Sequence, residues 1–503
     1  MKLKTLVGSL VVAQTTGNTD VDIEGIEVDS RQVKPGDLFV ALKGFTVDGH
    51  EYISQAVEKG AAAVVVEEEA GATGDVPVVR VPDTRRAMAV LADVFYRHPS
   101  QELKVIGVTG TNGKTTTTHL IREILQDRGR KTGLIGTIHM SVDNDVYPVK
   151  NTTPEAVDLQ RGFRKMADAG CSHAVMEASS HALHMGRTRG CRIKTAVFTN
   201  LTQDHLDYHG TMERYRHAKS LLFGQLGNTF ADRAEDQPLA VLNADDEASR
   251  AFMEVTPAQV ITYGVEKPAD VQAENIRYHS GGTRFTLNTF RGSVDIDMKL
   301  VGKFSVYNAL TAAAAALGEG VSPEQIRDTL NRIEGVPGRF EPVDAGQPFT
   351  VLVDYAHTPD SLENVLTTIR DFATGSVCCV VGCGGDRDRS KRPVMARIAA
   401  EYSDQAIITS DNPRTEDPKE IIDDMLAGVK DDAEARIQTI FDRAEAIRYA
   451  VESAGPEDVI LIAGKGHETY QEINGVRHDF DDREVARKAI LSKGSGYNAK
   501  NVE

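Results

Sequence analysis

The chain has 503 residues, which predicts about three domains at about 150 residues each. Hydrophobic residues make up 41% of the chain and charged residues 26%, so each domain can bury an ordinary core and general disorder is excluded. The net charge of −17 and the absence of Trp argue against nucleic acid as a partner, because duplexes need a basic surface and single strands need aromatic platforms. No apolar run reaches the ~18–20 residues of a membrane span, so no membrane insertion is expected.

Two further sequence features have simple interpretations. The five Cys residues match neither a disulfide framework nor a zinc ribbon, and we interpret them as buried thiols. An apolar run at residues 6–13 follows two lysines and faintly resembles a signal peptide. Gly8 and Ser9 interrupt that run and no convincing small-x-small cleavage site follows, so we expect a cytoplasmic protein.

The first predicted unit, residues 1–98, contains short strand and helix patterns. A β-like run at residues 37–42 precedes a helix-then-strand pattern at residues 53–66 and a further strand at residues 76–81. The segment at residues 97–100 contains Pro99, which breaks regular structure, so we interpret it as a linker.

The second predicted unit, residues 99–337, alternates strands with helices. An apolar strand at residues 104–109 runs into a Gly-rich turn and then a helix, and further apolar runs occur at residues 174–176, 196–199 and 239–242. This alternation predicts a largely parallel sheet with helices on both faces. Residues 276–287 instead predict a hairpin around Gly281-Gly282, which would form an antiparallel ribbon at the sheet edge.

The third predicted unit, residues 338–503, has four strand candidates that each end in polar residues. The strands are residues 350–353, 377–381, 406–409 and 459–462, and the polar segments that follow them are residues 354–357, 382–387, 411–414 and 464–468. Ligands bind beyond the carboxyl ends of the strands in open α/β sheets, so these four loops predict a binding crevice.

The strongest local motif is Thr109-Gly-Thr-Asn-Gly-Lys-Thr-Thr116, between a strand and a helix. Gly110 and Gly113 let backbone N–H groups approach phosphate oxygens, Lys114 neutralises charge, and the Thr115 hydroxyl can hold Mg²⁺. The motif departs from a strict phosphate-binding loop at Val108, where Gly is usual. The alternative, a coincidental Gly turn, does not explain the strand before it and the helix after it.

Three other segments bear residues suited to catalysis or metal binding. Glu177 follows a strand and could bind Mg²⁺ through oxygen, or be a solvated loop charge. Residues 199–209 contain two His and two Asp within six positions, which suggests a metal or phosphate site, although a single His is more often structural. Lys219 lies in a helical pattern, where a Lys is more often a surface residue.

In order and over nearly the whole chain, these segments resemble the Mur ligase family. The resemblance rests on residues 110–116, the Glu177 segment, residues 204–207, Tyr215 to Lys219, residues 307–309, 338–339 and 354–357. The motifs Asp411-Asn-Pro-Arg414 and Gly464-Lys-Gly-His-Glu468 point to the branch that adds a diamino acid to UDP-N-acetylmuramoyl-L-Ala-D-Glu (UDP-MurNAc-L-Ala-D-Glu) in peptidoglycan precursor synthesis.

The resemblance implies a three-domain α/β fold. Residues 1–98 would bind the UDP-sugar, residues 99–337 would form the central parallel-sheet domain with the ATP-binding P-loop, and residues 338–503 would form a Rossmann-like amino-acid-binding domain. A cytoplasmic monomer with small-molecule substrates is expected.

The resemblance also implies roles for individual residues. Nucleotide contacts fall on Gly110, Thr111, Asn112, Gly113, Lys114, Thr115, Thr116, Asn308, Arg339 and Asp354. Contacts to the UDP-sugar dipeptide fall on Ser30, Arg31, Asn151, Thr152, Thr153, Ser179 and Arg187. Contacts to the incoming amino acid fall on Arg387, Asp411, Asn412, Arg414, Gly464 and Glu468. The catalytic residues would be Lys114, Glu177, His205 and Lys219.

Two Mg²⁺ ions are implied by the same resemblance. Thr115 and Glu177 would bind the first, while His205 would bind the second together with Lys219, which the family converts to a carbamate with CO₂. The resemblance thereby favours a catalytic role for Lys219 over a surface one.

The implied reaction activates the D-Glu side-chain carboxylate as an acyl phosphate with ATP and then lets an amine attack. The amine belongs to meso-diaminopimelate or L-lysine, which differ by one distal carboxylate. Arg414 favours diaminopimelate, because an Arg fork binds a carboxylate through two hydrogen bonds. The alternative for Arg414 is a surface salt bridge to Glu416 or Asp417.

Two other functions stay open at this point. One is another Mur-type or folylpolyglutamate-type ligase, against which the Asp411–Arg414 motif and the Ser30 region argue. The other is a non-catalytic nucleotide-binding relative, which would be expected to have lost some of the four catalytic residues that this chain retains.

Overall fold

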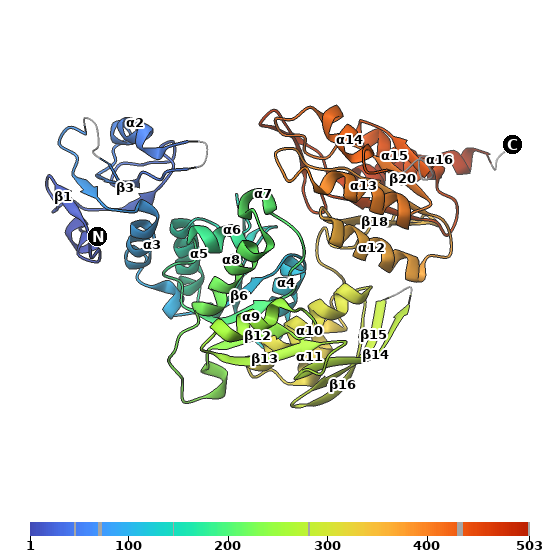
Figure 1. Cartoon of the computed structure of the whole chain (residues 1–503), viewed down its shortest axis with the longest axis horizontal. Helices are drawn as coiled ribbons and strands as arrows, with labels where there is room; N and C mark the ends of the chain where they lie inside the picture. Colours follow the sequence, from blue (N-terminus) through green and yellow to red (C-terminus); the bar gives the residue numbers. More distant parts are fainter. Residues whose placement is uncertain (45–46, 69–72, 144, 280–281, 430–435, 501–503) are drawn as a thin grey trace.

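The computed structural model describes residues 1–44, 47–68, 73–143, 145–279, 282–429 and 436–500. Its strands form three large sheets that follow one another along the chain, together with a two-stranded hairpin. Figure 1 shows the first unit in blue at the upper left, the central unit in light blue to yellow below, and the last unit in orange and red at the upper right. All three sheets carry helices, which confirms the predicted α/β class.

The first sheet has five strands in the order β1-β5-β4-β3-β2, and all neighbours are parallel except β1 and β5. Its elements are α1 (Leu3–Val7), β1 (Gln14–Thr16), β2 (Gly25–Glu27), β3 (Asp37–Val40), α2 (Ile53–Glu58), β4 (Ala63–Val66), β5 (Val78–Arg80) and α3 (Thr84–Phe95). The predicted runs at residues 37–42, 53–66 and 76–81 are confirmed as β3, α2 with β4, and β5. Ala156 and Val157 of the central unit belong to the same core cluster as α3, so apolar packing joins the two units.

The central sheet has eleven strands in the order β16-β15-β14-β13-β12-β11-β6-β10-β7-β8-β9. Its strands are β6 (Lys104–Thr109), β7 (Thr132–Ile135), β8 (Met140–Val142), β9 (Asp145–Tyr147), β10 (His173–Glu177), β11 (Ile193–Phe198), β12 (Leu239–Asn243), β13 (Gln259–Gly264), β14 (Val271–His279), β15 (Gly282–Thr289) and β16 (Gly292–Met298). Its helices are α4 (Lys114–Gln126), α5 (Ala156–Asp168), α6 (Ser180–Met185), α7 (Leu206–His209), α8 (Met212–Gly224), α9 (Ala248–Val255), α10 (Lys303–Gly318) and α11 (Pro323–Leu330).

Neighbouring residues of β6 belong to different cores on the two faces of the central sheet. Ile106 and Val108 pack with α4 and α10, whereas Val105 packs with α5 and α8. This division follows from the two-residue period of a strand, and it explains why β6 is apolar throughout, as a strand buried on both faces must be.

The parallel part of the central sheet runs from β14 to β7, and antiparallel strands extend it at both edges. β14 and β15 pair antiparallel, which confirms the predicted ribbon at residues 276–287. Gly281, one of the two residues on which its turn was predicted, lies outside the described residues. β16 and the three-residue β9 are the outermost strands.

The third sheet has six strands in the order β17-β18-β22-β19-β20-β21, parallel except for β17. Its elements are β17 (Glu341–Pro342), β18 (Thr350–Asp354), α12 (Pro359–Phe372), β19 (Val377–Val381), α13 (Lys391–Tyr402), β20 (Gln405–Ile408), α14 (Pro418–Leu426), β21 (Ile437–Thr439), α15 (Arg443–Ser453), β22 (Val459–Ala463) and α16 (Asp482–Lys500). The four predicted strands are confirmed as β18, β19, β20 and β22. α12, α13 and α14 cover one face, while α15 and α16 cover the other. The hairpin of β23 (Tyr470–Ile473) and β24 (Val476–Asp479) lies beside this sheet.

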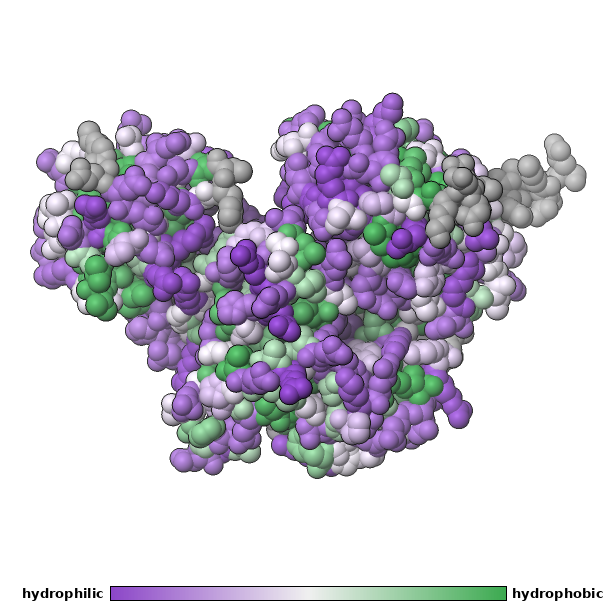
Figure 2. Space-filling view, in the orientation of Figure 1, coloured by the Kyte–Doolittle hydropathy of each residue, from purple (hydrophilic) through white to green (hydrophobic). Residues whose placement is uncertain are grey.

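Within the described residues, no helix has both the length and the apolar character needed to cross a membrane. Figure 2 shows a mostly hydrophilic face on which hydrophobic residues are scattered in small groups.

A buried ion pair joins the two helices on one face of the third sheet. Arg443 and Asp482 have fully buried side chains and share two hydrogen bonds, of 2.7 and 2.8 Å. Arg443 Nη2 also donates to Ala463 O at the end of β22. We therefore expect Asp482→Ala to cost about 3–5 kcal/mol, because it leaves a buried guanidinium without its counter-charge.

Thermal melting followed by circular dichroism measures this loss. Glu484→Ala is the matched control on the same helix, because it removes an ion pair that is exposed to solvent, the one with Lys488 at 3.7 Å. An exposed pair contributes little, so this variant should change stability by less than about 0.5 kcal/mol. Equal melting temperatures for the two variants would contradict the role given to the buried pair.

Candidate active site

The phosphate-loop motif folds as predicted, between β6 and α4. Gly113 precedes the helix with φ +84°, a left-handed conformation that favours glycine. Lys114 Nζ curls back onto the loop and donates to the carbonyl oxygens of Gly110 and Thr111 at 2.9 and 2.8 Å. Burial lowers the pKa of Lys114, while Glu177 and Asp204 oppose that shift. The loop thus places backbone N–H groups, a helix N-terminus and an ammonium group together, which suits a phosphate chain.

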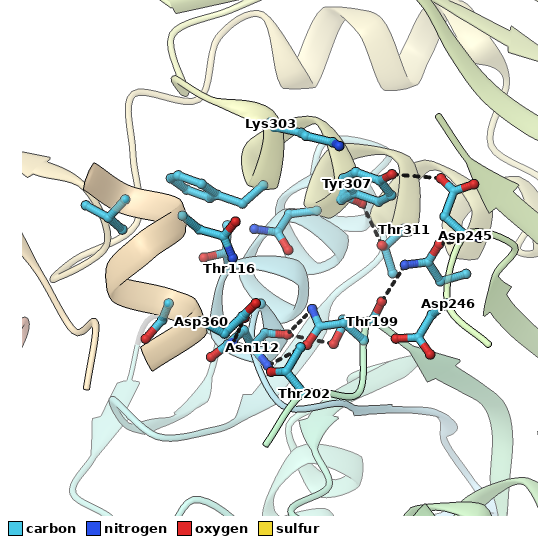
Figure 3. A pocket seen from close by; sticks show the side chains of 18 of the residues that line it. Asn112, Thr116, Thr199, Thr202, Asp245, Asp246, Lys303, Tyr307, Thr311 and Asp360 are labelled. Carbon is cyan, nitrogen blue, oxygen red and sulfur yellow. Dashed lines mark hydrogen bonds between the residues drawn. The ribbon is translucent and has the colours of Figure 1, made fainter. Parts of the chain in front are cut away.

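A cavity of about 350 Å³ lies on one side of this loop, between the central and third units. Predicted nucleotide residues in its wall are Asn112, Gly113, Thr116, Asn308, Arg339 and Asp354. Figure 3 shows Asn112 beside Asp360, and Tyr307 pointing at Asp245. Tyr307 donates to Asp245 Oδ2 at 2.7 Å, and Asn112 Nδ2 donates to Asp360 Oδ2 at 2.6 Å.

Several residues of this wall were not among the predicted contacts, namely Asn200, Asn243, Asp245, Tyr307 and Asp360. Tyr307 and Asn200 lie inside motifs that the sequence made visible. Asp360 had no local signal, because only the packing of α12 against the phosphate loop brings it to the cavity.

A second cavity, of about 270 Å³, begins on the other side of the same loop. Asn112, Gly113 and Arg339 line both cavities, so the two meet at the phosphate loop. Its central-unit wall contains Lys114, Thr115, Thr152, Glu177, Ser179 and His205, and its third-unit wall contains Arg387, Asp411, Asn412, Arg414, Gly464 and Glu468. The four loops that follow β18, β19, β20 and β22 therefore meet in one crevice, as predicted.

Glu177 lies at the end of β10, buried beside the start of α4. Its carboxylate accepts hydrogen bonds from Thr115 Oγ1 at 3.2 Å and from the backbone N and Oγ1 of Thr137 at 2.7 and 3.0 Å. It is thus not a solvated loop charge, and that alternative is wrong. A carboxylate and a hydroxyl are hard oxygen donors of the kind that Mg²⁺ prefers.

The described residues contain no group of three or more His, Cys, Asp or Glu side chains arranged to bind a metal. A cation at Thr115 and Glu177 would therefore take its other ligands from phosphate oxygens and water, which is usual for Mg²⁺.

Lys219 is buried, so its interpretation as a surface lysine is wrong. Only 1% of the residue is exposed, and its Nζ donates to Gly110 O at 2.7 Å and lies 4.4 Å from the centre of the Tyr215 ring. Desolvation and the nearby Lys114 hold the pKa of Lys219 well below its ordinary value. A lysine with a lowered pKa has a larger neutral fraction, and the neutral amine is the form that reacts with CO₂.

His205 directly precedes α7, with its Nε2 3.3 Å from Asp204 Oδ2. Desolvation lowers the pKa of His205 and Asp204 opposes that shift, so the neutral ring that can bind a metal is favoured.

Arg414 is not paired with Glu416 or Asp417, so the salt-bridge alternative is wrong for the described residues. Its Nη1 donates to Gly385 O at 2.7 Å, while Glu416 pairs with Arg392 instead. Arg387 also lines the second cavity, and burial and then the nearby Arg414 lower its pKa. Two close cations in one wall create a strong preference for an anionic group.

Two other residues predicted to contact the incoming amino acid, Asn412 and Glu468, are hydrogen-bonded to each other and to Lys465. Asn412 Nδ2 donates to Glu468 Oε2 at 2.8 Å. The fully buried Lys465 donates to Asn412 Oδ1 and Glu468 Oε2 at 3.0 and 3.1 Å. Lys465 was not among the predicted site residues, although it lies inside the Gly464–Glu468 motif.

The predicted UDP-sugar residues lie in two places. Thr152 and Ser179 line the second cavity, Thr153 Oγ1 donates to Glu177 O at 2.8 Å, and Arg187 Nη1 donates to Thr153 O at 3.0 Å. The neighbouring Asn151 is exposed.

Ser30 and Arg31 lie in the first unit, outside the walls of both cavities. Ser30 Oγ donates to Gln55 Oε1 at 2.6 Å, and Arg31 pairs with Asp29 at 2.9 Å. The structure therefore does not bring these two residues to the phosphate loop.

Family models match most of the chain. A Mur ligase family catalytic-domain model matches residues 22–96, a Mur ligase middle-domain model matches residues 108–316, and a Mur ligase glutamate ligase domain model matches residues 338–466. The chain belongs to the Mur ligase family. Among its relatives within that family are UDP-N-acetylmuramoyl-L-alanyl-D-glutamate--2,6-diaminopimelate ligases from Bacillus cereus, 55% identical over 98% of this chain and 99% of the relative, and from Geobacillus kaustophilus, 56% identical over 98% and 100%.

Solved structures of Mur ligases share the fold. A UDP-N-acetylmuramoyl-L-alanyl-D-glutamate--2,6-diaminopimelate ligase superimposes with a TM-score of 0.67 at 35% identity and covers 98% of this chain and 99% of its own. MurF from Thermotoga maritima, solved in complex with ADP, superimposes with a TM-score of 0.62 at 19% identity over 95% and 98% of the chains. The second likeness concerns the fold alone.

The geometry of the phosphate loop predicts that this Mur ligase does not tolerate Gly113→Ala. A Cβ at Gly113 would lie 2.4 Å from Asn308 Oδ1, at a φ of +84°. We expect an approximately 10- to 100-fold weaker Kd for a non-hydrolysable ATP analogue, because strain and the displacement of Asn308 together amount to about 1–3 kcal/mol.

Isothermal titration calorimetry measures that Kd. Gly129→Ala is a matched control, since Gly129 has φ +70° but nothing within 4 Å of the added Cβ. It should lower stability slightly and leave the Kd unchanged. Wild-type affinity in Gly113→Ala would contradict the assignment of this loop to the nucleotide.

Proposed function

We propose that this chain uses ATP to join meso-diaminopimelate to the D-Glu side-chain carboxylate of UDP-MurNAc-L-Ala-D-Glu, a step in peptidoglycan precursor synthesis. The observation that carries this function is one continuous site. The phosphate loop and the Arg387–Arg414 pair line the same cavity, and this supports a site in which phosphate and carboxylate groups of the substrates bind close together.

The nucleotide binds in the 350 Å³ cavity, with its phosphates over residues 110–115. Among the described residues, the buried Nε of Arg339 has no hydrogen-bond partner, and its Nη2 donates to Thr115 Oγ1 at 3.0 Å. A phosphate oxygen between the two units would satisfy that Nε. Arg339 and Lys114 then offset the charge of the terminal phosphate as the carboxylate approaches.

The acceptor carboxylate arrives through the predicted residues 151–153, 179 and 187. The buried Arg187 Nε likewise has no partner among the described residues, while Arg187 Nη2 pairs with Glu155 at 2.9 Å. We propose that Arg187 orients the dipeptide so that the D-Glu carboxylate attacks the γ-phosphorus of ATP and ADP leaves. The amine of the second substrate then attacks the acyl phosphate, and inorganic phosphate leaves.

Mg²⁺, when bound, would be held by Thr115 and Glu177 at one position and by His205 and the Lys219 carbamate at another, and it would screen the repulsion between carboxylate and triphosphate. The oxygen donors of Thr115 and Glu177 fit that ion, and the buried Lys219 with its lowered pKa fits carbamate formation. Lys114 and the loop N–H groups position the phosphates whether or not the second position is filled.

Diaminopimelate is the proposed amino acid because of the two cations in the third unit. Arg387 and Arg414 would bind its distal carboxylate, and Asn412 with Glu468 would bind the polar groups at one of its amino-acid centres. L-lysine lacks the distal carboxylate and would leave the Arg pair without a counter-charge, which disfavours it strongly.

We also propose a cytoplasmic, monomeric enzyme, since ATP and the UDP-sugar are cytoplasmic substrates. A non-catalytic relative is disfavoured, because Lys114, Glu177, His205 and Lys219 are all present around the second cavity or directly behind it.

The first test is phosphate release with ATP, Mg²⁺ and UDP-MurNAc-L-Ala-D-Glu. We expect release and a tripeptide product with meso-diaminopimelate, and at least about 1,000-fold lower kcat/KM with L-lysine, because an unpaired buried charge costs several kcal/mol. Equal rates with both amino acids would overturn the selectivity, and no release with either would overturn the function.

The second test concerns Lys219. Lys219→Ala should lower kcat by at least about 100-fold, because it removes the proposed anionic group beside the phosphates. Lys219→Gln is a control that keeps much of the side-chain volume, and it should be equally impaired. Incubation of the unmodified enzyme with ¹³C-bicarbonate should give a carbamate carbon resonance that both variants lack; a folded Lys219→Ala variant with full activity would reject the role.

A further inference from the structure

The two loops that bear Arg387 and Arg414 are bonded directly to each other. Gly385 N donates to Asn412 O at 2.9 Å, and Arg414 Nη1 donates to Gly385 O at 2.7 Å. These two hydrogen bonds fix the loop after β19 against the loop after β20. A shift of either loop changes the distance between the two guanidinium groups.

Glu416, two residues after Arg414, makes a further hydrogen bond between the two loops. Its Oε1 accepts from Asp386 N at 2.5 Å. The Asp386 carboxylate in turn accepts from Thr415 Oγ1 and Thr415 N at 2.8 and 3.2 Å. Asp386 has φ +52° and Arg414 has φ +51°, conformations that non-glycine residues seldom adopt without support from their surroundings.

Arg392 of α13 lies behind both loops with a fully buried side chain. It binds both carboxylate oxygens of Glu416, at 2.8 and 2.9 Å, and Asp424 of α14 at 2.8 Å. Its Nη2 also lies 3.4 Å from Gly384 O, in the first of the two loops. One guanidinium thus connects α13, α14 and both loops. Its bidentate pair with Glu416 fixes the orientation of the two side chains as well as their distance.

Support of this kind has a physical reason. Arg387 and Arg414 line the same cavity and repel each other. When no substrate carboxylate lies between them, this repulsion favours a larger distance between the two loops. The hydrogen bonds between the loops and the Arg392–Glu416 pair oppose that force. Neither Arg392 nor Glu416 lines the cavity, so neither contacts a substrate placed there.

We propose that the Arg392–Glu416 ion pair is a positioning device for amino-acid selectivity, which holds Arg387 and Arg414 at the spacing that one distal carboxylate requires. This inference rests on the proposed function and adds two selectivity-determining residues that do not touch the substrate. It separates the recognition of the distal carboxylate from the chemistry at the phosphate loop.

The test is Glu416→Gln, which keeps the size of the side chain but removes its charge. We expect the KM for meso-diaminopimelate to rise about 10- to 100-fold, since small displacements of positioning groups have effects of this size. The kcat at saturating diaminopimelate and the KM for ATP should change by less than about 2-fold, because the phosphate loop is untouched. Arg392→Lys, which keeps the charge but loses the two-pronged geometry, should give an intermediate KM.

Asp424→Asn is the matched control. Asp424 binds the same Arg392 nitrogen and loses the same charge, but it belongs to α14 and meets the loop after β19 only at Arg389, next to α13, and not at residues 384–386, where the two loops are joined. It should lower the melting temperature and leave the KM for diaminopimelate near the wild-type value. Equal rises in KM for Glu416→Gln and Asp424→Asn would show a general structural effect and overturn the proposal.

The remaining outcomes also decide the matter. A wild-type KM in Glu416→Gln would reject the positioning role alone, whereas failure of the unmodified enzyme to use diaminopimelate would reject the proposed function first. If Glu416→Gln does not fold, Arg392→Lys takes its place as the test, because it keeps the charge of the pair and loses the two parallel hydrogen bonds to Glu416. A KM increase of about 3- to 10-fold in that variant would support the proposal, and an unchanged KM would overturn it.

Discussion

The whole site depends on how the third unit is held against the phosphate loop. Arg339 Nη2 donates to Thr115 Oγ1 at 3.0 Å, and its guanidinium lies 4.7 Å from the centre of the Tyr355 ring. Gly338 before it has φ +68°, and a Cβ there would lie 2.1 Å from His467 N. The segment that connects the two units therefore passes so close to the Gly464–Glu468 loop that only glycine fits.

This contact matters because both cavities include Arg339 in their walls. The 350 Å³ cavity lies between α12 and α10, and the 270 Å³ cavity lies between the phosphate loop and the four loops of the third unit. The parallel strands in each sheet bring the carboxyl ends of that sheet together, and Arg339 lies in the walls of both cavities where the loops of the two sheets meet. Both cavities are thus shared between units that each bury their own core.

Much of the fold followed from periodic patterns in the sequence. β6 and β19 have the bounds that their apolar runs predicted, and the polar residues after each strand of the third sheet gave the position of the crevice. These features depend on local residue order and on the direction of parallel strands. Side-chain contacts between residues distant in the sequence do not depend on local order, so the local pattern alone favoured a surface position for Lys219 and left a salt bridge between Arg414 and Glu416 open as an alternative. The contact of Asp360 with Asn112 spans 248 positions and had no local signal at all.

The edges of the central sheet have a consequence for association between molecules. Along β16 the outward positions carry Asp295 and Asp297, which pair with Thr286 and Arg284 on the neighbouring strand, while Val294 and Ile296 point into the core. The opposite edge ends in the three-residue β9. Short or acidic edge strands resist the addition of a further strand from another chain, which is the usual first step of β-aggregation. An eleven-stranded sheet can therefore stay discrete at the high concentrations of a crowded cell.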